Sequence, residues 1–249
     1  MPTALFLSPH LDDVAFSCGG TLALLADRSW RTVMVTAFTA TVLPAAGFAL
    51  ACQLDKGLSP EIDYMELRRA EDRAAAAILG VADLRWLPLP EAPHRGYSSA
   101  PELFADIRPG DDIWQELAQH LAALRAELSP DLILAPQGLG GHVDHRQLIR
   151  AVQITAGPTP VAWYRDTPYA IRNPEARPFV DCGPASVVPI AAALDRKVEA
   201  ACAYTSQIGF QFGGADAAGR ALREFALREG HGEPAERFSG NLPADALQP

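Results

Sequence analysis

Short apolar runs alternate along this chain with longer, helix-like stretches. The apolar runs predict strands over 3–8, 31–38, 85–89, 131–136 and 161–164, with shorter strands near Phe179 and Val187. The stretches between them predict helices over 14–26, 61–79, 111–128, 145–155, 191–203 and 216–228, the third capped by Asp111 or Asp112. Strands that alternate with helices are typical of α/β proteins. We therefore expect a Rossmann-like, doubly wound, mostly parallel sheet with helices on both faces.

Two segments interrupt this alternation. Residues 39–60 and 90–110 are irregular and contain proline, and we expect them to be loops near the functional site. The tail after Gly230 is polar and contains proline, which predicts that it is loosely held. With 249 residues, 49% of them hydrophobic, the chain is long enough for one large core, so we expect a single domain over 1–249.

Composition narrows the classes of function. A net charge of −9 argues against a nucleic-acid partner, because phosphate-backbone binders need clustered Lys and Arg. The chain runs from Met1 into a strand-like segment without a basic flank, and no apolar stretch is long enough to span a bilayer. Its four cysteines are widely spaced. We therefore expect a cytoplasmic protein with free thiols and no transmembrane segment, and the possibility of a homo-oligomer stays open.

The segment that follows the first predicted strand carries the most chemistry. His10, Asp12 and Asp13 lie in one short turn between this strand and the next helix. In an open α/β sheet, ligands bind at the carboxyl ends of the strands. Taken alone, however, either aspartate could cap the helix and the histidine could be an ordinary turn residue.

A second cluster follows the fourth predicted strand, where His142 and His145 form an H-x-x-H pattern. The common strand order 3-2-1-4-5 places the first and fourth strands side by side, so the two clusters should face each other. Together they supply imidazole and carboxylate groups for a catalytic metal site with a neighbouring base. His94, His120 and His231 lack such company.

The two clusters resemble the motifs of the PIG-L/LmbE-like superfamily of zinc-dependent N-acetylglucosamine deacetylases. Two further segments match this superfamily in the same order along the chain. Arg68 and Glu71 resemble its R-x-x-E helix, and Lys197 with the Tyr204–Gln207 segment resembles its C-terminal K-x-x-A…S-Q segment. The resemblance thus covers about residues 4 to 207 and implies the superfamily's α/β fold.

The resemblance also implies a role for each site residue. It implies that His10, Asp13 and His145 hold Zn²⁺ and that Asp12 is the general base, with His142 nearby in its protonated form. The expected substrate is an N-acetylated amino sugar within a small-molecule conjugate, and the products are acetate and a free amine. The base would take a proton from a metal-activated water as the water attacks the acetamide.

Two more residues have a functional and a structural interpretation. Asp144 is expected to orient a metal-binding imidazole, although it could equally cap a helix. By analogy, Arg68 is expected to bind a sugar hydroxyl or an anionic group, although it could be an exposed helix residue paired with Glu71 or Asp72.

Three positions depart from the superfamily pattern. Pro is more common where Leu11 stands, and an acidic residue is more common where Val14 stands. Some relatives have Tyr at the position of Gly140, so a tyrosine at that point is not available to stabilise an oxyanion here. None of these departures removes a proposed ligand or the base.

Other interpretations of the same residues lead to other functions. Gly138 and Gly140 partly match a dinucleotide-binding loop, but the third glycine position is Val143 and the loop follows the wrong strand. Two histidines and one carboxylate also suit Fe²⁺, as in oxygenases. A sugar-binding module on the same fold is a third possibility, against which the retention of Asp12 argues. The loops at 39–60 and 90–110 are expected to select the substrate, and Phe48, Leu50, Tyr97 and Phe104 hint at an apolar or bulky acceptor.

Overall fold

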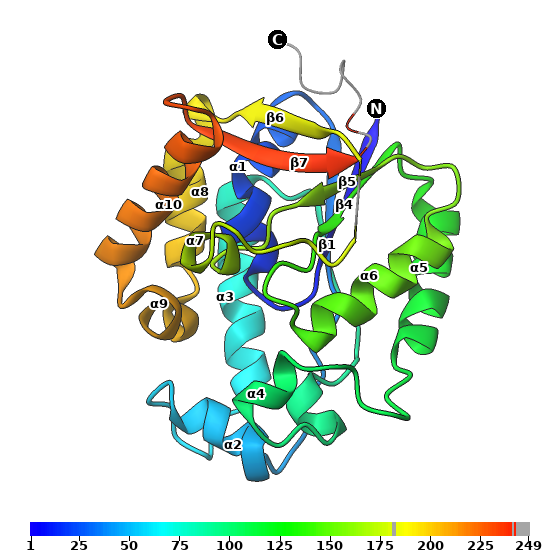
Figure 1. The fold of residues 1–249 in the computed structure, drawn as a ribbon, viewed down its shortest axis with the longest axis vertical. Coiled ribbons are helices and arrows are strands. Elements are labelled where there is room, and N and C mark those ends of the chain that lie inside the picture. The colour runs from blue at the N-terminus through cyan, green and yellow to red at the C-terminus, as the bar shows by residue number, and fades with distance from the viewer. Residues whose placement is uncertain (181–182, 241, 243–249) are drawn as a thin grey trace.

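A mixed seven-stranded sheet forms the centre of the fold in the computed structural model, which describes residues 1–180, 183–240 and 242 (Figure 1). Its strands are β1 (Thr3–Ser8), β2 (Arg31–Thr36), β3 (Asp83–Trp86), β4 (Leu132–Pro136), β5 (Val161–Tyr164), β6 (Ala185–Pro189) and β7 (Ala235–Gly240). They lie in the order β3-β2-β1-β4-β5-β7-β6. The first five are parallel, whereas β7 pairs antiparallel with both β5 and β6.

Helices cover both faces of the sheet. They are α1 (Asp13–Asp27), α2 (Gly47–Leu54), α3 (Tyr64–Leu79), α4 (Ala100–Leu103), α5 (Trp114–Leu128), α6 (Val143–Thr155), α7 (Tyr169–Arg172), α8 (Leu194–Cys202), α9 (Thr205–Phe212) and α10 (Ala215–Glu229). Single 3₁₀ turns occupy Ala92–Arg95 and Ala191–Ala193. In Figure 1, α5 and α6 lie on one side of the sheet, and α1, α3, α8 and α10 lie on the other.

Strand β1 shows how the sequence builds these layers. Ala4 and Phe6 belong to the core under α1 and α3, whereas Leu5 and Leu7 belong to the core under α5 and α6. Successive side chains of a strand point to opposite faces, so a strand buried on both faces must be apolar throughout. This explains the continuous apolar run and confirms the predicted doubly wound fold with its 3-2-1-4-5 order.

Element boundaries differ from the predictions by a few residues. Strand β3 lies earlier than the predicted 85–89. Helix α3 begins at Tyr64 because the Asp63 side chain caps it by accepting a hydrogen bond from Glu66 N at 2.9 Å. The predicted cap of α5 is wrong, since Ile113 precedes that helix and Asp111 pairs with Arg95 instead.

Some elements were not expected at all. The segment 39–60 contains helix α2, and 90–110 contains a 3₁₀ turn and helix α4. Helix α9 lies in a stretch for which no element was predicted. The expected strand near Val187 is β6, but Phe179 belongs to no strand.

The prediction of a loosely held tail from about residue 230 is wrong for 235–240, which form β7 inside the sheet. Residues 241 and 243–249 lie outside the described part of the chain. Glu236 of this strand forms a buried ion pair with Lys197 of α8, which holds the strand against that helix. Within the described ranges, no helix is long and apolar enough to cross a membrane. The single domain, the cytoplasmic location and the oligomeric state stay predictions.

Candidate active site

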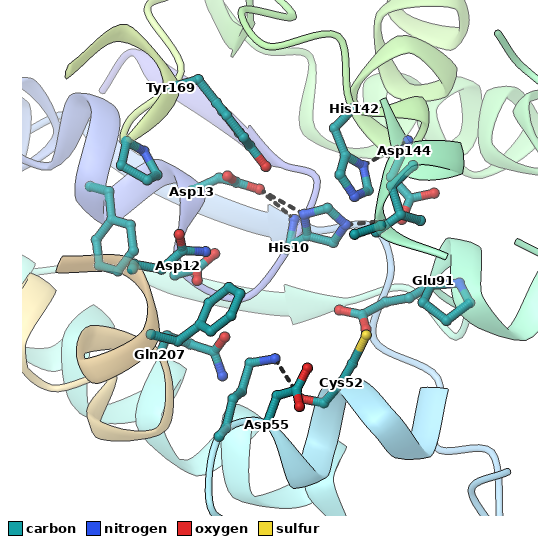
Figure 2. A pocket seen from close by; sticks show the side chains of 18 of the residues that line it. His10, Asp12, Asp13, Cys52, Asp55, Glu91, His142, Asp144, Tyr169 and Gln207 are labelled. Carbon is teal, nitrogen blue, oxygen red and sulfur yellow. Dashed lines mark hydrogen bonds and ion pairs between the residues drawn. The ribbon is translucent and has the colours of Figure 1, made fainter. Parts of the chain in front are cut away.

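Three side chains converge at the carboxyl ends of β1 and β4, and Figure 2 labels two of them, His10 and Asp13. His10 lies in the turn after β1, Asp13 begins α1, and His145 lies in the first turn of α6. His10 Nδ1 lies 3.3 Å from Asp13 Oδ2, and His145 Nε2 lies 3.4 Å from the same oxygen. The predicted adjacency of β1 and β4 is therefore what brings the two sequence clusters together.

A buried carboxylate holds the far nitrogen of each imidazole. Asp144 Oδ2 lies 2.9 Å from His10 Nε2, and Asp166 Oδ1 lies 2.6 Å from His145 Nδ1. Asp144 also pairs with Arg95 at 2.7 Å, so it does not cap α6 as the alternative interpretation had it. Asp166 belongs to none of the motifs in the sequence. Its position just after β5, at the same edge of the sheet, was the available signal.

This donor set fits a divalent metal ion. Ligand atoms of His10, Asp13 and His145 all lie within 4.8 Å of one another. His145 is fully buried, yet its Nε2 has no hydrogen-bond partner among the described residues. A buried nitrogen without a partner is costly, and a metal ion at this point would satisfy it. Burial would raise the pKa of Asp13, but His145 and His10 lower it to about 2, so this ligand is ionised.

Asp12 lies beside these three side chains but is not part of the candidate ligand group. Its side chain makes no capping hydrogen bond at the start of α1, and the Ser8 hydroxyl instead accepts the hydrogen bond of Val14 N. Burial and the neighbouring Asp13 carboxylate raise the pKa of Asp12 to about 7. A carboxylate with such a pKa can exchange protons near neutral pH.

Arg68 is buried at the site and is not an exposed helix residue. Its guanidinium lies 3.9 Å from Asp12 and 2.5 Å from Glu91, and it donates a hydrogen bond to the carbonyl oxygen of Leu11. Glu71 and Asp72, its alternative partners, face other groups. Arg68 therefore lines the cavity, and the carboxylates of Asp12 and Glu91 compensate its positive charge.

The surroundings of His142 favour its neutral form, whereas the resemblance implies a protonated ring. His142 caps α6, where its Nδ1 accepts a hydrogen bond from Asp144 N at 3.2 Å. A nitrogen that accepts a hydrogen bond carries no proton, so the ring proton lies on Nε2. Burial and the adjacent His10 lower the pKa of His142 to about 3.

A cavity of about 290 Å³ opens in front of this centre. The expected loops supply part of its wall through Phe48, Cys52 and Phe104. Leu50 and Tyr97 do not line it, and Tyr97 is instead buried in a small cluster with Ala92 and Val143. Gln207 of the C-terminal motif also lines the cavity, as do residues that no motif indicated: Lys56, Tyr64, Tyr169, Arg172, Phe210 and Gln211.

The R-x-x-E helix and the C-terminal K-x-x-A…S-Q segment contact each other and support part of the cavity wall. Glu71 of α3 accepts hydrogen bonds from Ser206 N and Ser206 Oγ, both at 2.7 Å, at the first turn of α9. Gln207 of α9 then donates to the Tyr64 hydroxyl at 3.0 Å. The R-x-x-E helix, α3, thus places Arg68 at the site, and its Glu71 holds helix α9, which forms part of the cavity wall.

The structure shows what surrounds the three positions that depart from the superfamily pattern. Leu11 and Val14 are both buried in the core. Gly140 has a φ of +85°, and a Cβ there would lie 2.6 Å from the ring of Tyr169. Gly140 is therefore required both by its backbone and by the side chain packed against it.

A doubly wound sheet with a buried His-Asp-His centre at its carboxyl edge defines an α/β protein with a candidate metal centre of the hydrolytic kind. The family model described as GlcNAc-PI de-N-acetylase, PIG-L, matches residues 5–156. The chain belongs to this family, so the family inferred from its motifs is confirmed.

Individual relatives agree with this assignment. A 2'-N-acetylparomamine deacetylase of Streptomyces fradiae is 32% identical, over 82% of this chain and 72% of that protein. A 1D-myo-inositol 2-acetamido-2-deoxy-alpha-D-glucopyranoside deacetylase of Actinosynnema mirum is 28% identical over 95% of both chains. N-Deacetylation, the function expected from the sequence, is the activity named for both relatives.

Solved structures give the same result. Two crystal structures of a deacetylase from teicoplanin biosynthesis, one a complex with bog and the other a zinc-inhibited form, superpose with TM-scores of 0.85 and 0.81. Each is 25% identical and covers 96% of this chain and 97% of its own. The likeness extends over nearly the whole fold.

Proposed function

We propose that this protein is a metal-dependent hydrolase that removes the acetyl group from an N-acetylated amino sugar within a small-molecule conjugate. The observation that carries the proposal is the convergence of potential ligand atoms from His10, Asp13 and His145. Beside them, Asp12 lines the cavity with a carboxylate that is not part of this ligand group. Acetate and a free amino sugar would be the products. Family membership and the named activities of the relatives support this reaction.

His10, Asp13 and His145 would hold the ion. Two imidazoles, one carboxylate and an open position are the usual donor set of catalytic zinc, which when bound activates water and polarises a carbonyl. Asp144 and Asp166 would fix the orientation of the two imidazoles. Zn²⁺ is our first choice of metal, with Fe²⁺ as the alternative that metal analysis would reveal.

Asp12 would move the protons of the reaction. It would accept a proton from the attacking water and then return that proton to the departing amine. The positively charged guanidinium of Arg68 lies 3.9 Å from the Asp12 carboxylate. A single residue would thus act first as base and then as acid.

His142 would serve as a hydrogen-bond donor. Its Nε2–H is the free end of a ring whose Nδ1 is fixed by the backbone of α6. A neutral imidazole is a poor acid but a good donor, so it would stabilise the negative oxygen of the tetrahedral intermediate. This assigns the protonation of the amine to Asp12.

Arg68 and the cavity wall would bind the conjugate. The guanidinium, already paired with Glu91, can bind a sugar hydroxyl in the cavity. Aromatic residues of the two loops and of α9 would contact the part of the substrate beyond the sugar: Phe48, Phe104 and Phe210.

The test combines metal analysis of the purified protein with acetate release from a panel of N-acetylglucosamine conjugates, including a paromamine derivative and a myo-inositol glycoside. Asp12→Ala should keep its metal and lose at least about 100-fold in turnover. His145→Ala should lose both metal and activity. His120→Ala, a histidine on α5 outside the cavity, is the matched control and should behave like wild type.

Four results would contradict the proposal. Full activity of Asp12→Ala with metal bound would remove the proposed base. Turnover by metal-free protein would exclude the metal-dependent mechanism. Turnover that depends on dioxygen and a 2-oxo acid would indicate the iron-oxygenase alternative, and sugar binding without acetate release would indicate a binding module.

A further inference from the structure

Tyr169 occupies a position at the candidate metal centre that no sequence motif indicated. It begins α7 and lines the cavity. Its ring lies edge-on to His145, with 5.7 Å between ring centroids, and packs against Phe104 at 5.8 Å. The ring is therefore held between the proposed metal ligand and the cavity wall.

Gly140 fixes this position from behind. A Cβ at residue 140 would lie 2.6 Å from Cδ1 and 2.7 Å from Cγ of Tyr169. Atoms that are not bonded do not approach so closely, so the ring occupies the space that a side chain at 140 would fill. The tyrosine ring thus depends on the missing side chain of the glycine.

The hydroxyl of Tyr169 is directed at the centre. Figure 2 shows it pointing toward Asp13 and His10, on the same side of the centre as His142. No residue in the described ranges forms a hydrogen bond with this hydroxyl. A donor that faces the reacting space without a partner is available for the substrate.

We propose that the Tyr169 hydroxyl donates a hydrogen bond to the acetamide oxygen as that oxygen becomes negative, together with Nε2–H of His142. The inference rests on the proposed deacetylase function and assigns to it a second oxyanion donor. The phenol keeps its proton throughout. The hydrogen bond strengthens as the carbonyl becomes tetrahedral, so it lowers the barrier more than it tightens substrate binding.

Tyr169→Phe tests the proposal, because Phe keeps the ring and removes only the hydroxyl. We expect kcat to fall about 100-fold, with metal content and KM nearly unchanged. An N-thioacetyl substrate makes the test specific, since sulfur accepts hydrogen bonds weakly. With that substrate the difference between wild type and variant should shrink to about threefold.

Tyr97→Phe is the control for loss of a tyrosine hydroxyl, because Tyr97 is buried outside the cavity and donates to Asp111. It should retain wild-type kcat when folded. This comparison separates the loss of the donor from a general effect of removing a buried hydroxyl.

Two glycines provide an independent test. Gly140 and Gly141 have φ of +85° and +76°, so alanine strains the backbone similarly at both. A Cβ at 141 meets nothing within 4 Å, whereas one at 140 displaces Tyr169. Gly140→Ala should therefore lose most of the activity that Tyr169→Phe loses, and Gly141→Ala should not. The double variant of Gly140→Ala with Tyr169→Phe should be no worse than the worse single variant.

Several outcomes would overturn the proposal. One is a Tyr169→Phe variant within twofold of wild type, and another is an equal loss on acetyl and thioacetyl substrates. Loss of metal together with activity would show a structural role. In each of these cases wild-type acetate release would leave the deacetylase function standing, whereas a wild type that deacetylates no member of the panel would overturn both.

Discussion

At the scale of single residues, His10 and His145 share one arrangement. Each turns one ring nitrogen toward Asp13 and the other toward a buried carboxylate, Asp144 or Asp166. Both rings are therefore oriented before any ion binds. Such preorganisation raises metal affinity, because little ordering remains to be done on binding.

Asp166→Asn should weaken metal binding about 10- to 100-fold, because the amide orients the His145 ring less strongly than a carboxylate does. The fold should persist, since the amide oxygen can still accept the hydrogen bond from Leu139 N. Competition with a chelator of known affinity measures the effect. Asp106→Asn, at an exposed site, is the control, and equal affinities for both variants would contradict this role.

Asp72 predicts a pH dependence of stability. It accepts hydrogen bonds from Trp86 and Tyr204, but burial raises its pKa to about 6. The folded state thus holds a proton between about pH 4 and 6 that the unfolded state releases. This contribution is present below pH 4 and is lost as pH rises through 6. Relative to Asp72→Asn, the wild type should lose up to about 3 kcal/mol of unfolding free energy over this range.

Denaturant unfolding of both proteins at several pH values measures this difference. The comparison cancels the effect of the substitution on packing, which does not vary with pH. A constant difference between the two proteins from pH 4 to 7 would exclude the raised pKa.

The sequence could predict the residues that lie in dense motifs. His10, Asp12 and Asp13 share one turn, and strand order alone places His145 opposite them. Asp166 and Tyr169 lie outside such motifs, and the role of each depends on a contact made in three dimensions. The neutral state of His142 likewise depends on its capping bond and its burial.

At the scale of elements, the link between α3 and α9 decides the shape of the pocket. Glu71 satisfies the first turn of α9, where a negative charge also interacts favourably with the helix dipole. That helix then presents Gln207 and Phe210 to the cavity. A buried carboxylate that does not itself line the cavity thus supports a wall of the site.

Glu71→Ala should lower the unfolding free energy by about 2–4 kcal/mol, because it leaves Ser206 N and two hydroxyls without their acceptor. It should also raise KM more than it lowers kcat, since the substrate wall moves and the metal centre does not. Chemical denaturation and steady-state kinetics measure both effects. Glu66→Ala, on the exposed face of the same helix, should change neither, and equal effects of the two variants would refute this link.

Strands and helices with a clear pattern were predictable, and others were not. Strand β4 and residues 4–7 of β1 are apolar because both faces of these strands are buried. By contrast, β7 contains Glu, Arg and Ser, and its place in the sheet depends on the pairing of Glu236 with Lys197. Helix α2 contains no charged residue and has no marked polar face, so its sequence pattern does not distinguish it from a loop.

At the scale of the whole molecule, one buried ion pair joins three distant segments. Lys197 Nζ lies 2.7 Å from Glu236 Oε1 and donates to the carbonyl oxygen of Ser17 at 3.1 Å. Glu236 also accepts hydrogen bonds from Gly20 N and Thr21 N, just beyond the interruption of α1 at Cys18. The carboxylate therefore caps the second half of α1 from the opposite end of the chain.

Lys197→Met should destabilise the protein by about 3–5 kcal/mol, because it leaves the Glu236 charge buried and unpaired. Combining it with Glu236→Gln should recover part of this loss. Thermal and denaturant unfolding measure the cycle. Arg196→Met is the control, because Arg196 lies on the same helix as Lys197 but pairs with Asp27 of α1 at the surface, so its loss should have little effect. Equal losses of stability for Lys197→Met and Arg196→Met would contradict the argument.

Gly20 and Glu236 stand 216 positions apart, which sets an order of events during synthesis. The amides of α1 and later the ammonium of Lys197 leave the ribosome before the carboxylate that satisfies them. Until β7 is made, the surface of β5 that pairs with it is an open strand edge, and such edges favour aggregation. Substitutions in β7 should therefore reduce the yield of folded protein in cells before they alter turnover by the molecules that do fold.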